Sequence, residues 1–334
     1  MSDMTKRAYR TFAEQALHYF VRPHESVPLE PLQHLAAWTA QTMANKPEKW
    51  FFTLSPEETD EIRQAVDHVQ HLGLSLEEIS SENFPLPLLV PRLMEWKAML
   101  KSGQGFFALR GLPVEDWGDE RSAIAFWGLG HNLGIPGGQN PQNELLGHVK
   151  DYDEEGDNPS VRRYRTAGNI DFHCDAADVV GLLCLRKAKS GGQSRIASST
   201  AIYNEILKQN PDLAQQLFEP MLLDLRGEHK PGDAPVRKMV PAAFAKGDLK
   251  VFWHSEYFRS SDRHQGYAFS QEQTELLDLF DNLAASPEFH IDMWLEPGDM
   301  QFISNHTIVH ARTEYEDGSG DNEKRHLLRL WLSV

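Results

Sequence analysis

Two residues of one short segment, His173 and Asp175, have the types and the spacing of metal ligands. They lie in Phe172-His173-Cys174-Asp175, just before a strand-like stretch at 178–186. In an extended chain, residues i and i+2 point to the same side, so the imidazole and the carboxylate can bind one ion. A second histidine would complete two imidazoles and one carboxylate, with positions left open for a co-substrate and oxygen. That arrangement is typical of non-haem Fe(II) oxygenases.

The second histidine is either His310 or His306. Both lie in the segment 302–313, and because they differ by four residues they share one strand face. His310 is the preferred candidate, and His306 competes with it. The alternative interpretation is that each histidine is a hydrogen-bonded core or surface residue, because an isolated His-x-Asp also occurs by chance.

Two arginines near the C-terminus are candidates for binding an anion. Arg325 and Arg329 belong to the segment 324–332, which has the pattern of a buried terminal strand. Their spacing places both on one face, and a buried guanidinium without a partner would be costly. Its planar fork can bind a carboxylate through two hydrogen bonds, such as the distal carboxylate of 2-oxoglutarate. Internal salt bridges are the alternative.

A glycine pair precedes a further candidate, Ser194. The segment Gly191-Gly192-Gln193-Ser194 follows the strand-like stretch at 178–186. Two glycines permit a tight turn or positive φ angles. Ser194 would open the next strand and could donate its hydroxyl to the same carboxylate. A plain hairpin turn explains the glycines equally well, so only Ser194 adds information.

Short strands and outer helices are predicted to position these residues. Apolar runs closed by turn residues predict strands at 106–110, 178–186, 194–198, 250–254, 289–295, 300–304, 306–312 and 326–333. Helical patterns occupy 199–208, 211–218 and 271–284, and a capping box at Ser55 starts another helix from Pro56 to about Leu72. The sequence therefore predicts an α+β fold with a mainly antiparallel β core at 105–334 and a helical flank or cap at 1–104.

Composition excludes several classes of function. The 334 residues include 33 Lys and Arg against 49 Asp and Glu, a net charge of −16, which is the wrong sign for nucleic-acid binding. No segment resembles a signal peptide or a membrane span. The two cysteines, Cys174 and Cys184, are too few for a disulfide framework or a cysteine zinc site. A cytoplasmic protein is expected, and self-association is compatible with its size. The acidic run 151–157 is predicted to be a solvated loop.

The order of the motifs resembles the taurine dioxygenase and clavaminate synthase-like family of Fe(II)- and 2-oxoglutarate-dependent oxygenases. The match covers about residues 105–334 and consists of His173-x-Asp175, Gly191-Gly192-Gln193-Ser194, Pro297-Gly298-Asp299, His310-Ala311-Arg312-Thr313 and Arg325-x-x-x-Arg329. The resemblance implies a double-stranded β-helix, or jelly roll. It also implies His173, Asp175 and His310 as iron ligands, Ser194 and Arg325 as 2-oxoglutarate-binding residues, and Arg329 as a residue facing the substrate. His310 is thereby favoured over His306.

The implied activity is that of a dioxygenase using Fe(II), 2-oxoglutarate and O₂. Such an enzyme would hydroxylate or desaturate an unactivated C–H bond of a small polar metabolite, and it would release succinate and CO₂. An anionic group on the substrate would suit Arg329, and five further residues are candidates for the mouth of the site: Arg163, Tyr164, Thr166, His254 and Tyr257.

The sequence departs from the family pattern at Cys174, and three other classes of protein can be weighed against the oxygenase. Cys174 stands where a threonine is more usual, and alternation points it away from the metal. The presence of Asp175 argues against a halogenase, in which a small residue replaces the carboxylate. A non-catalytic metal-binding jelly-roll protein would not need Arg325 and Ser194. A metal-dependent hydrolase would need a general base beside a metal-bound water.

Overall fold

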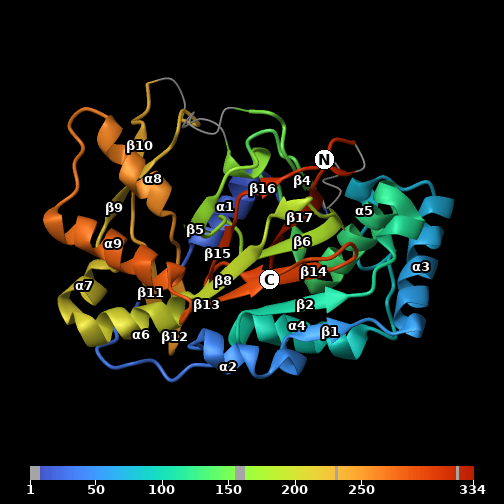
Figure 1. Cartoon of the computed structure of the whole chain (residues 1–334), viewed down its shortest axis with the longest axis horizontal. Helices are drawn as coiled ribbons and strands as arrows, with labels where there is room; N and C mark the ends of the chain where they lie inside the picture. The colour runs from blue at the N-terminus through green and yellow to red at the C-terminus, as the bar shows by residue number, and fades with distance from the viewer. Residues whose placement is uncertain (1–7, 155–161, 230–231, 321–322) are drawn as a thin grey trace, which may run out of the picture.

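The larger of two main sheets forms the middle of the molecule, with helices at both ends (Figure 1). The computed structural model describes residues 8–154, 162–229, 232–320 and 323–334. The sheet has the order β1-β2-β14-β6-β17-β3, and β4 also pairs with β17. All pairings are antiparallel except that of β1 with β2. Its strands are β1 (Phe51–Thr53), β2 (Phe106–Arg110), β3 (Ile135–Pro136), β4 (Gly147–Val149), β6 (Val179–Arg186), β14 (Met300–Ser304) and β17 (His326–Ser333).

The smaller sheet has four antiparallel strands in the order β13-β8-β15-β5. They are β5 (Ile170–His173), β8 (Ser194–Ser198), β13 (His290–Met293) and β15 (Ile308–Arg312). Apolar side chains of both sheets meet in one buried cluster, in which Val180 and Trp331 of the larger sheet accompany Ile196 and Ile308 of the smaller one. Three two-stranded pairs complete the β structure: β7 (Ser190–Gly191) with β16 (Tyr315–Glu316), β9 (Met221–Asp224) with β10 (Val236–Met239), and β11 (Ala242–Ala245) with β12 (Asp248–Val251).

Helices cover the outer faces of both sheets. One group packs its apolar residues on the larger sheet: α3 (Pro56–His71), α4 (Val90–Ser102) and α5 (Val114–Leu133). The group at the opposite end packs with the smaller sheet (Figure 1): α6 (Ser199–Gln209), α7 (Pro211–Gln216), α8 (Ser255–Arg259) and α9 (Gln271–Ala285). The remaining helices are α1 (Phe12–Phe20), α2 (Ala40–Ala44) and the 3₁₀ turns Pro47–Lys49, Leu76–Glu78, Arg163–Arg165 and Ser260–Arg263.

The structure confirms the mixed α+β fold and most of the predicted elements. Helix α3 spans Pro56–His71, and the side chains of Ser55 and Glu58 form the predicted capping box. Strands β2, β8, β14 and β17 have the predicted bounds. The strand predicted at 250–254 is instead β12, Asp248–Val251. It starts earlier because Lys246 and Gly247, both with positive φ, form the two-residue turn of the β11–β12 hairpin.

The longest helix, α5, was not predicted. Gly118 interrupts it with a φ of 72°, so its first turn is not continuous with the rest. Most residues from Ile124 to Leu133 are buried, which removes the one-sided apolar pattern that identifies a surface helix. Gly128 and Gly130 also lower helix propensity, yet a Cβ at Gly128 would clash with the Phe84 ring.

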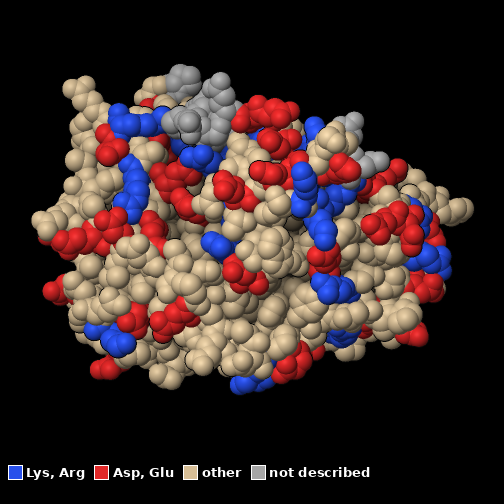
Figure 2. Space-filling view, in the orientation of Figure 1, with Lys and Arg blue, Asp and Glu red and all other residues tan. Residues whose placement is uncertain are grey.

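Charged side chains of both signs are interspersed on the face shown in Figure 2. Among the described residues, no helix is long and apolar enough to cross a bilayer. Asp151–Glu154, the first part of the predicted acidic loop, lies outside helices and strands. The rest of that loop, 155–157, lies outside the described residues.

A buried carboxylate, Asp178, fastens α1 to the sheets. Its Oδ2 lies 2.9 Å from Nε2 of His18 in α1 and accepts a hydrogen bond from the Val334 backbone N–H, while Oδ1 lies 2.9 Å from Nε2 of His306. Burial acts to raise the pKa of Asp178, but these hydrogen bonds and the neighbouring histidines outweigh it and lower the pKa from 3.8 to about 2. The ionised form is therefore the one that the fold stabilises.

We expect Asp178→Asn to lower the free energy of unfolding by about 2 kcal/mol near neutral pH. The folded-state pKa is depressed, so this contribution is fully present above the unfolded pKa of 3.8 and is lost as the pH falls through about 2. Urea unfolding of wild type and variant over a pH series measures it. The difference between the two proteins should shrink as the solution is acidified. A difference that stays constant with pH would contradict the electrostatic origin.

Candidate metal centre and active site

Three side chains form the one group of potential metal ligands found among the described residues: His173, Asp175 and His310. Their ligand atoms all lie within 4.8 Å of one another. His173 ends β5 and stands directly opposite His310 of β15 in the strand register. The two ring centroids are 4.2 Å apart, and His310 Nε2 lies 3.8 Å from Asp175 Oδ2. Strand pairing thus brings together two segments that are far apart in the sequence.

The protonation of these groups suits a divalent metal. His173 Nδ1 lies 2.9 Å from the carbonyl oxygen of Asp171, so Nδ1 is the donor and Nε2 is the ring atom that remains to face a metal. Burial, followed by the proximity of His173, lowers the pKa of His310 to about 3, so its imidazole is neutral. Metal ligation requires deprotonated ligands. Two imidazoles and one carboxylate fit Fe(II).

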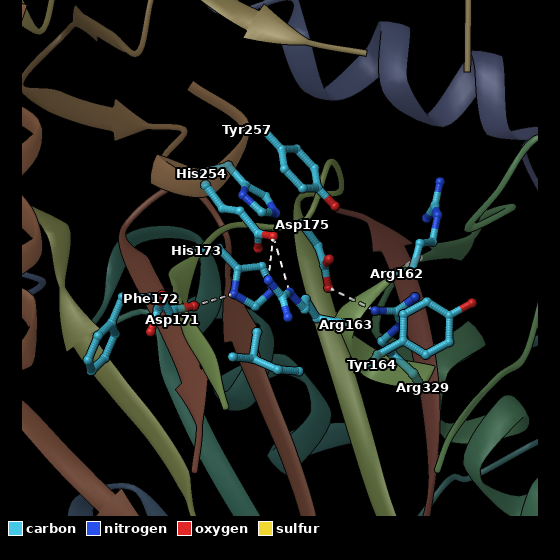
Figure 3. Close-up of a pocket in the computed structure, with 12 residues that line it drawn as sticks. Arg162, Arg163, Tyr164, Asp171, Phe172, His173, Asp175, His254, Tyr257 and Arg329 are labelled. Atoms are coloured by element: carbon cyan, nitrogen blue, oxygen red, sulfur yellow. Dashed lines mark hydrogen bonds and ion pairs between the residues drawn. The ribbon is translucent and has the colours of Figure 1, made fainter. Parts of the chain in front are cut away.

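Asp175 is held in its ionised form by its neighbours. Burial acts to raise its pKa, but Arg329, His310 and His173 together lower it below the ordinary value. The Trp331 indole N–H donates to Asp175 Oδ2 at 3.1 Å, and Arg329 Nη1 lies 3.7 Å from the same oxygen. Figure 3 shows the contact between Asp175 and Arg329. Both partners come from β17, so this strand orients the carboxylate.

We expect Trp331→Phe to weaken Fe(II) affinity by about 10- to 100-fold, the usual effect of removing an outer hydrogen bond to a ligand. The variant keeps an aromatic ring at this position but loses the indole N–H that orients Asp175. Anaerobic Fe(II) titration measures the change. Trp38→Phe is the matched control, because Trp38 belongs to the same buried cluster but donates to the Gln104 carbonyl oxygen. Equal iron affinities for the two variants would contradict the prediction.

The competing histidine, His306, lies elsewhere. Its Nε2 is hydrogen-bonded to Asp178, and its ring stacks on Tyr19 with a centroid distance of 4.7 Å.

The cysteine between the first two candidate ligands, Cys174, is 1% exposed and its Sγ lies against the carbonyl oxygens of Val251 and Ile308. The alternation predicted for His173-Cys174-Asp175 is therefore present.

A cavity opens beside His173 and Asp175 (Figure 3). Four of the five residues predicted for the mouth line it, namely Arg163, Tyr164, His254 and Tyr257, and Arg162 and Arg329 join them. Thr166 does not line it; this residue is buried and donates its hydroxyl to the Arg163 carbonyl oxygen. In the close-up, His254 and Tyr257 lie on one side of the cavity, and Tyr164 and Arg329 on another.

Burial shifts the pKa of two residues of this cavity, His254 and Tyr257. It lowers the pKa of His254 well below its usual range, and it raises the pKa of Tyr257 to about 12. Both side chains are neutral at physiological pH. The guanidinium group of Arg329 stacks over the Tyr164 ring at 4.4 Å, and its Nε donates to Gln139 Oε1 at 2.7 Å. The cavity wall therefore combines neutral hydrogen-bonding groups with charged groups of both signs, because Asp171, Asp175 and Glu256 line it together with the arginines.

The predicted 2-oxoglutarate-binding residues lie outside this cavity wall. Arg325 precedes β17, is 5% exposed, and lines a second cavity together with Gly192. Gly192 has a φ of 74°, and a Cβ there would lie 2.9 Å from Arg325 Nε, so the glycine permits the close approach. Ser194 is buried and donates its hydroxyl to Gln301 Oε1 at 3.0 Å.

Several residues of the site were not predicted from the sequence, among them Trp331, Gln139 and Arg162. Trp331 could have been found, because it lies two residues after Arg329 on the same strand face. Gln139 and Arg162 carry no such signal. They lie outside helices and strands, and Arg162 reaches the site with Nη1 donating to the Gln139 carbonyl oxygen and its fork bound to Glu228.

Comparison with known proteins agrees with this geometry. Residues 68–331 match the family described as "Taurine catabolism dioxygenase TauD, TfdA family". FR-33289 synthase of Streptomyces rubellomurinus is 32% identical over 292 residues, covering 86% of each chain. Taurine hydroxylase-like protein SAT17 of Stachybotrys chartarum is 28% identical over 305 residues, covering 88% of this chain and 77% of that protein.

The fold also matches a solved oxygenase. Asparagine oxygenase, in complex with Fe(II), 2S,3S-3-hydroxyasparagine and succinate, aligns with a TM-score of 0.69 at 17% identity, covering 85% of this chain and 93% of that one. Fold, ligand group and relatives together define a non-haem iron oxygenase that depends on 2-oxoglutarate. The chain belongs to the TauD, TfdA family. The enzyme class and the cofactors Fe(II) and 2-oxoglutarate predicted from the sequence are confirmed.

Proposed function

We propose that this dioxygenase oxidises an unactivated C–H bond of a small polar metabolite that carries an anionic group. The observation that carries the proposal is the His173-Asp175-His310 group at a cavity whose wall contains the guanidinium groups of Arg162 and Arg329. Hydroxylation is the expected outcome, and desaturation is the alternative.

In this proposal His173, Asp175 and His310 are the three iron ligands. Bound iron, together with 2-oxoglutarate and O₂, supplies the oxidising power for C–H cleavage. The protein contributes orientation. The Asp171 carbonyl oxygen holds the His173 ring, and Trp331 holds the Asp175 carboxylate. The buried cluster of both sheets beneath the site excludes water from that side.

Arg325 and Ser194 are proposed to bind the distal carboxylate of 2-oxoglutarate. Arg325 Nη1 is buried and has no hydrogen-bond partner among the described residues, which leaves a donor for an acceptor that the protein itself does not supply. The hydroxyl of Ser194 can rotate from Gln301 toward such a carboxylate, because a serine O–H is free to turn about its C–O bond.

Arg329 is proposed to bind the anionic group of the substrate. Its nearest carboxylate is Asp175, whose negative charge is shared with the metal once iron is bound. The guanidinium group then has capacity for a second anion, and its fork suits carboxylate, sulfonate or phosphate oxygens. Two relatives support small polar substrates of this kind. One is named after taurine, a sulfonate, and the solved structure contains a hydroxylated asparagine.

We also propose a double-stranded β-helix architecture and a cytoplasmic location for this enzyme. Residues 105–334 would form a double-stranded β-helix, with the two main sheets as its two halves and residues 1–104 as a helical flank of one compact unit. The packing of both sheets on one shared cluster supports this. A cytoplasmic location is supported by two buried, unpaired cysteines, Cys174 and Cys184.

Succinate release tests the function. Candidate amino acids, sulfonates, phosphonates and phosphate esters are incubated with the Fe(II)-loaded enzyme, 2-oxoglutarate and O₂, and succinate is measured against a control without substrate. Substrate-dependent succinate, with a product that gains one oxygen atom, supports hydroxylation. Loss of two hydrogen atoms indicates desaturation. Hydrolysed products without succinate would favour a metal-dependent hydrolase, and tight metal binding without any turnover would favour a binding protein.

A further inference from the structure

Two buried arginines, Arg312 and Arg325, form no ion pair with a carboxylate in the part of the chain that the structure describes. They are 6% and 5% exposed. Both guanidinium groups contact one ring, that of Tyr315, at 4.7 Å and 5.0 Å from its centroid. Two positive charges are thus concentrated around one ring, and the carboxylates of Asp151 and Asp317 act on them without forming an ion pair among the described residues.

The alternation of side chains along β15 places Arg312 on the same face of the smaller sheet as the candidate ligand His310. Arg312 lies two residues after His310 on this strand. In the register of β15 with β8, Arg312 stands opposite Ser194, just as His310 stands opposite Ile196. Arg312 and Ser194 therefore form the row of residues next to the one that contains His310.

The hydrogen bonding of Arg312 is incomplete. Its Nη2 donates to the carbonyl oxygens of Thr166, at 2.9 Å, and of Gly168. Its Nε and Nη1 are buried and have no hydrogen-bond partner among the described residues, and the same holds for Nη1 of Arg325. Buried polar groups are normally satisfied, and an orphaned guanidinium N–H indicates a missing acceptor.

The electrostatics indicate that the acceptor is an anion. Both guanidinium groups are buried beside the same Tyr315 ring, and an arginine keeps its positive charge in proteins. Two neighbouring buried cations without an anion are unfavourable, because each loses hydration and repels the other. A bound carboxylate would remove both penalties.

We propose that Arg312 is a second guanidinium ligand of the distal carboxylate of 2-oxoglutarate, acting together with Arg325 and beside Ser194. The inference rests on the proposed function, in which Arg325 and Ser194 bind that carboxylate. Two guanidinium forks supply more donors than a single one, enough to hold both carboxylate oxygens in fixed positions. The consequence is selectivity: 2-oxo acids that lack a distal carboxylate should bind poorly to this enzyme.

The alternative role of Arg312 is structural, since its bonds to Thr166 and Gly168 hold the segment that leads into β5. Anaerobic titration of the Fe(II)-loaded enzyme with 2-oxoglutarate and with 2-oxobutyrate separates the two roles. The visible absorption band of the chelated 2-oxo acid is the readout. 2-Oxobutyrate keeps the chelating end but lacks the distal carboxylate. Arg312→Gln is the test variant and Arg312→Lys keeps the charge.

We expect Arg312→Gln to raise the Kd for 2-oxoglutarate by about 10- to 100-fold, as for loss of hydrogen bonds to a charged group, and to leave the Kd for 2-oxobutyrate unchanged. Arg312→Lys should give an intermediate value. Arg195→Gln is the matched control, because Arg195 is on the neighbouring strand β8, next to Ser194, and pairs with Asp292 instead. It should bind both 2-oxo acids as the wild type does.

Other outcomes overturn the inference. Equal weakening of both 2-oxo acids would assign Arg312 the structural role, and unchanged affinity for 2-oxoglutarate would remove it from the site. If Arg312→Gln does not fold, Arg312→Lys replaces it in the test. Weaker binding of 2-oxoglutarate with unchanged binding of 2-oxobutyrate would then support the inference. A wild-type protein without the band would contradict the proposed function itself. If Arg325→Gln weakens 2-oxoglutarate binding and Arg312→Gln does not, only the role of Arg312 is wrong.

Discussion

His310→Ala abolishes formation of the iron-bound 2-oxoglutarate band, whereas His306→Ala preserves it. This is the expected result for two histidines four residues apart in the sequence with different partners. His310 lies with His173 and Asp175. His306 is bound to Asp178 and stacked on Tyr19. Without His310, one carboxylate and one imidazole remain, and turnover should fall by at least about 1000-fold, equivalent to about 4 kcal/mol of transition-state stabilisation.

For stability we expect the reverse: His306→Ala should lower the free energy of unfolding more than His310→Ala does. His306→Ala leaves a buried carboxylate with one fewer hydrogen bond, which should cost about 1–3 kcal/mol of unfolding free energy. Absorption spectra recorded anaerobically and urea unfolding of the same samples give both quantities. Asp175→Ala should behave as His310→Ala does, with the fold retained. A fully active Asp175→Ala enzyme would rule out the proposed ligand set.

Arg325→Ala raises the 2-oxoglutarate concentration required for half-maximal rate by about 100-fold, because it removes a charge-assisted, bidentate partner of the distal carboxylate. At saturating 2-oxoglutarate most of the rate should return, since Arg325 does not touch the cavity that holds His173 and Asp175. The substrate requirement should change little. Steady-state kinetics with each of the two compounds varied in turn measures both effects.

Lys187→Ala is the control for Arg325→Ala. Lys187 lines the same second cavity but is 60% exposed and paired with Glu296, and an exposed pair of this kind contributes little. Its 2-oxoglutarate requirement should match the wild type. If Arg325→Ala raised the requirement for substrate instead, the assignments of Arg325 and Arg329 would have to be exchanged.

Local patterns allowed much of the fold to be predicted. The strands with correct bounds, such as β8 and β14, are short apolar runs closed by turn residues. The helices with correct starts, such as α3, have a capping residue at the first turn. Helix α5 was missed because burial on nearly all sides erases the periodicity from which a helix is predicted. The parallel pairing of β1 with β2 has no local signal either.

The site residues likewise divide into those with a local sequence signal and those without one. The sequence by itself determined the chemical types and their local order: a His-x-Asp pair on one strand face, a later histidine, and two arginines spaced by four. These depend only on the alternation of side chains along an extended chain. The family and the cofactors followed from that order.

Only the tertiary structure decided which distant residues meet. Pairing of β15 with β5 sets His310 against His173, and the place of β17 beside β6 carries Trp331 and Arg329 to Asp175. The neighbouring charges of Arg312 and Arg325 also arise only there. The physical reason is that strand register depends on long-range packing, and a shift by one residue would turn every side chain to the other face of its sheet.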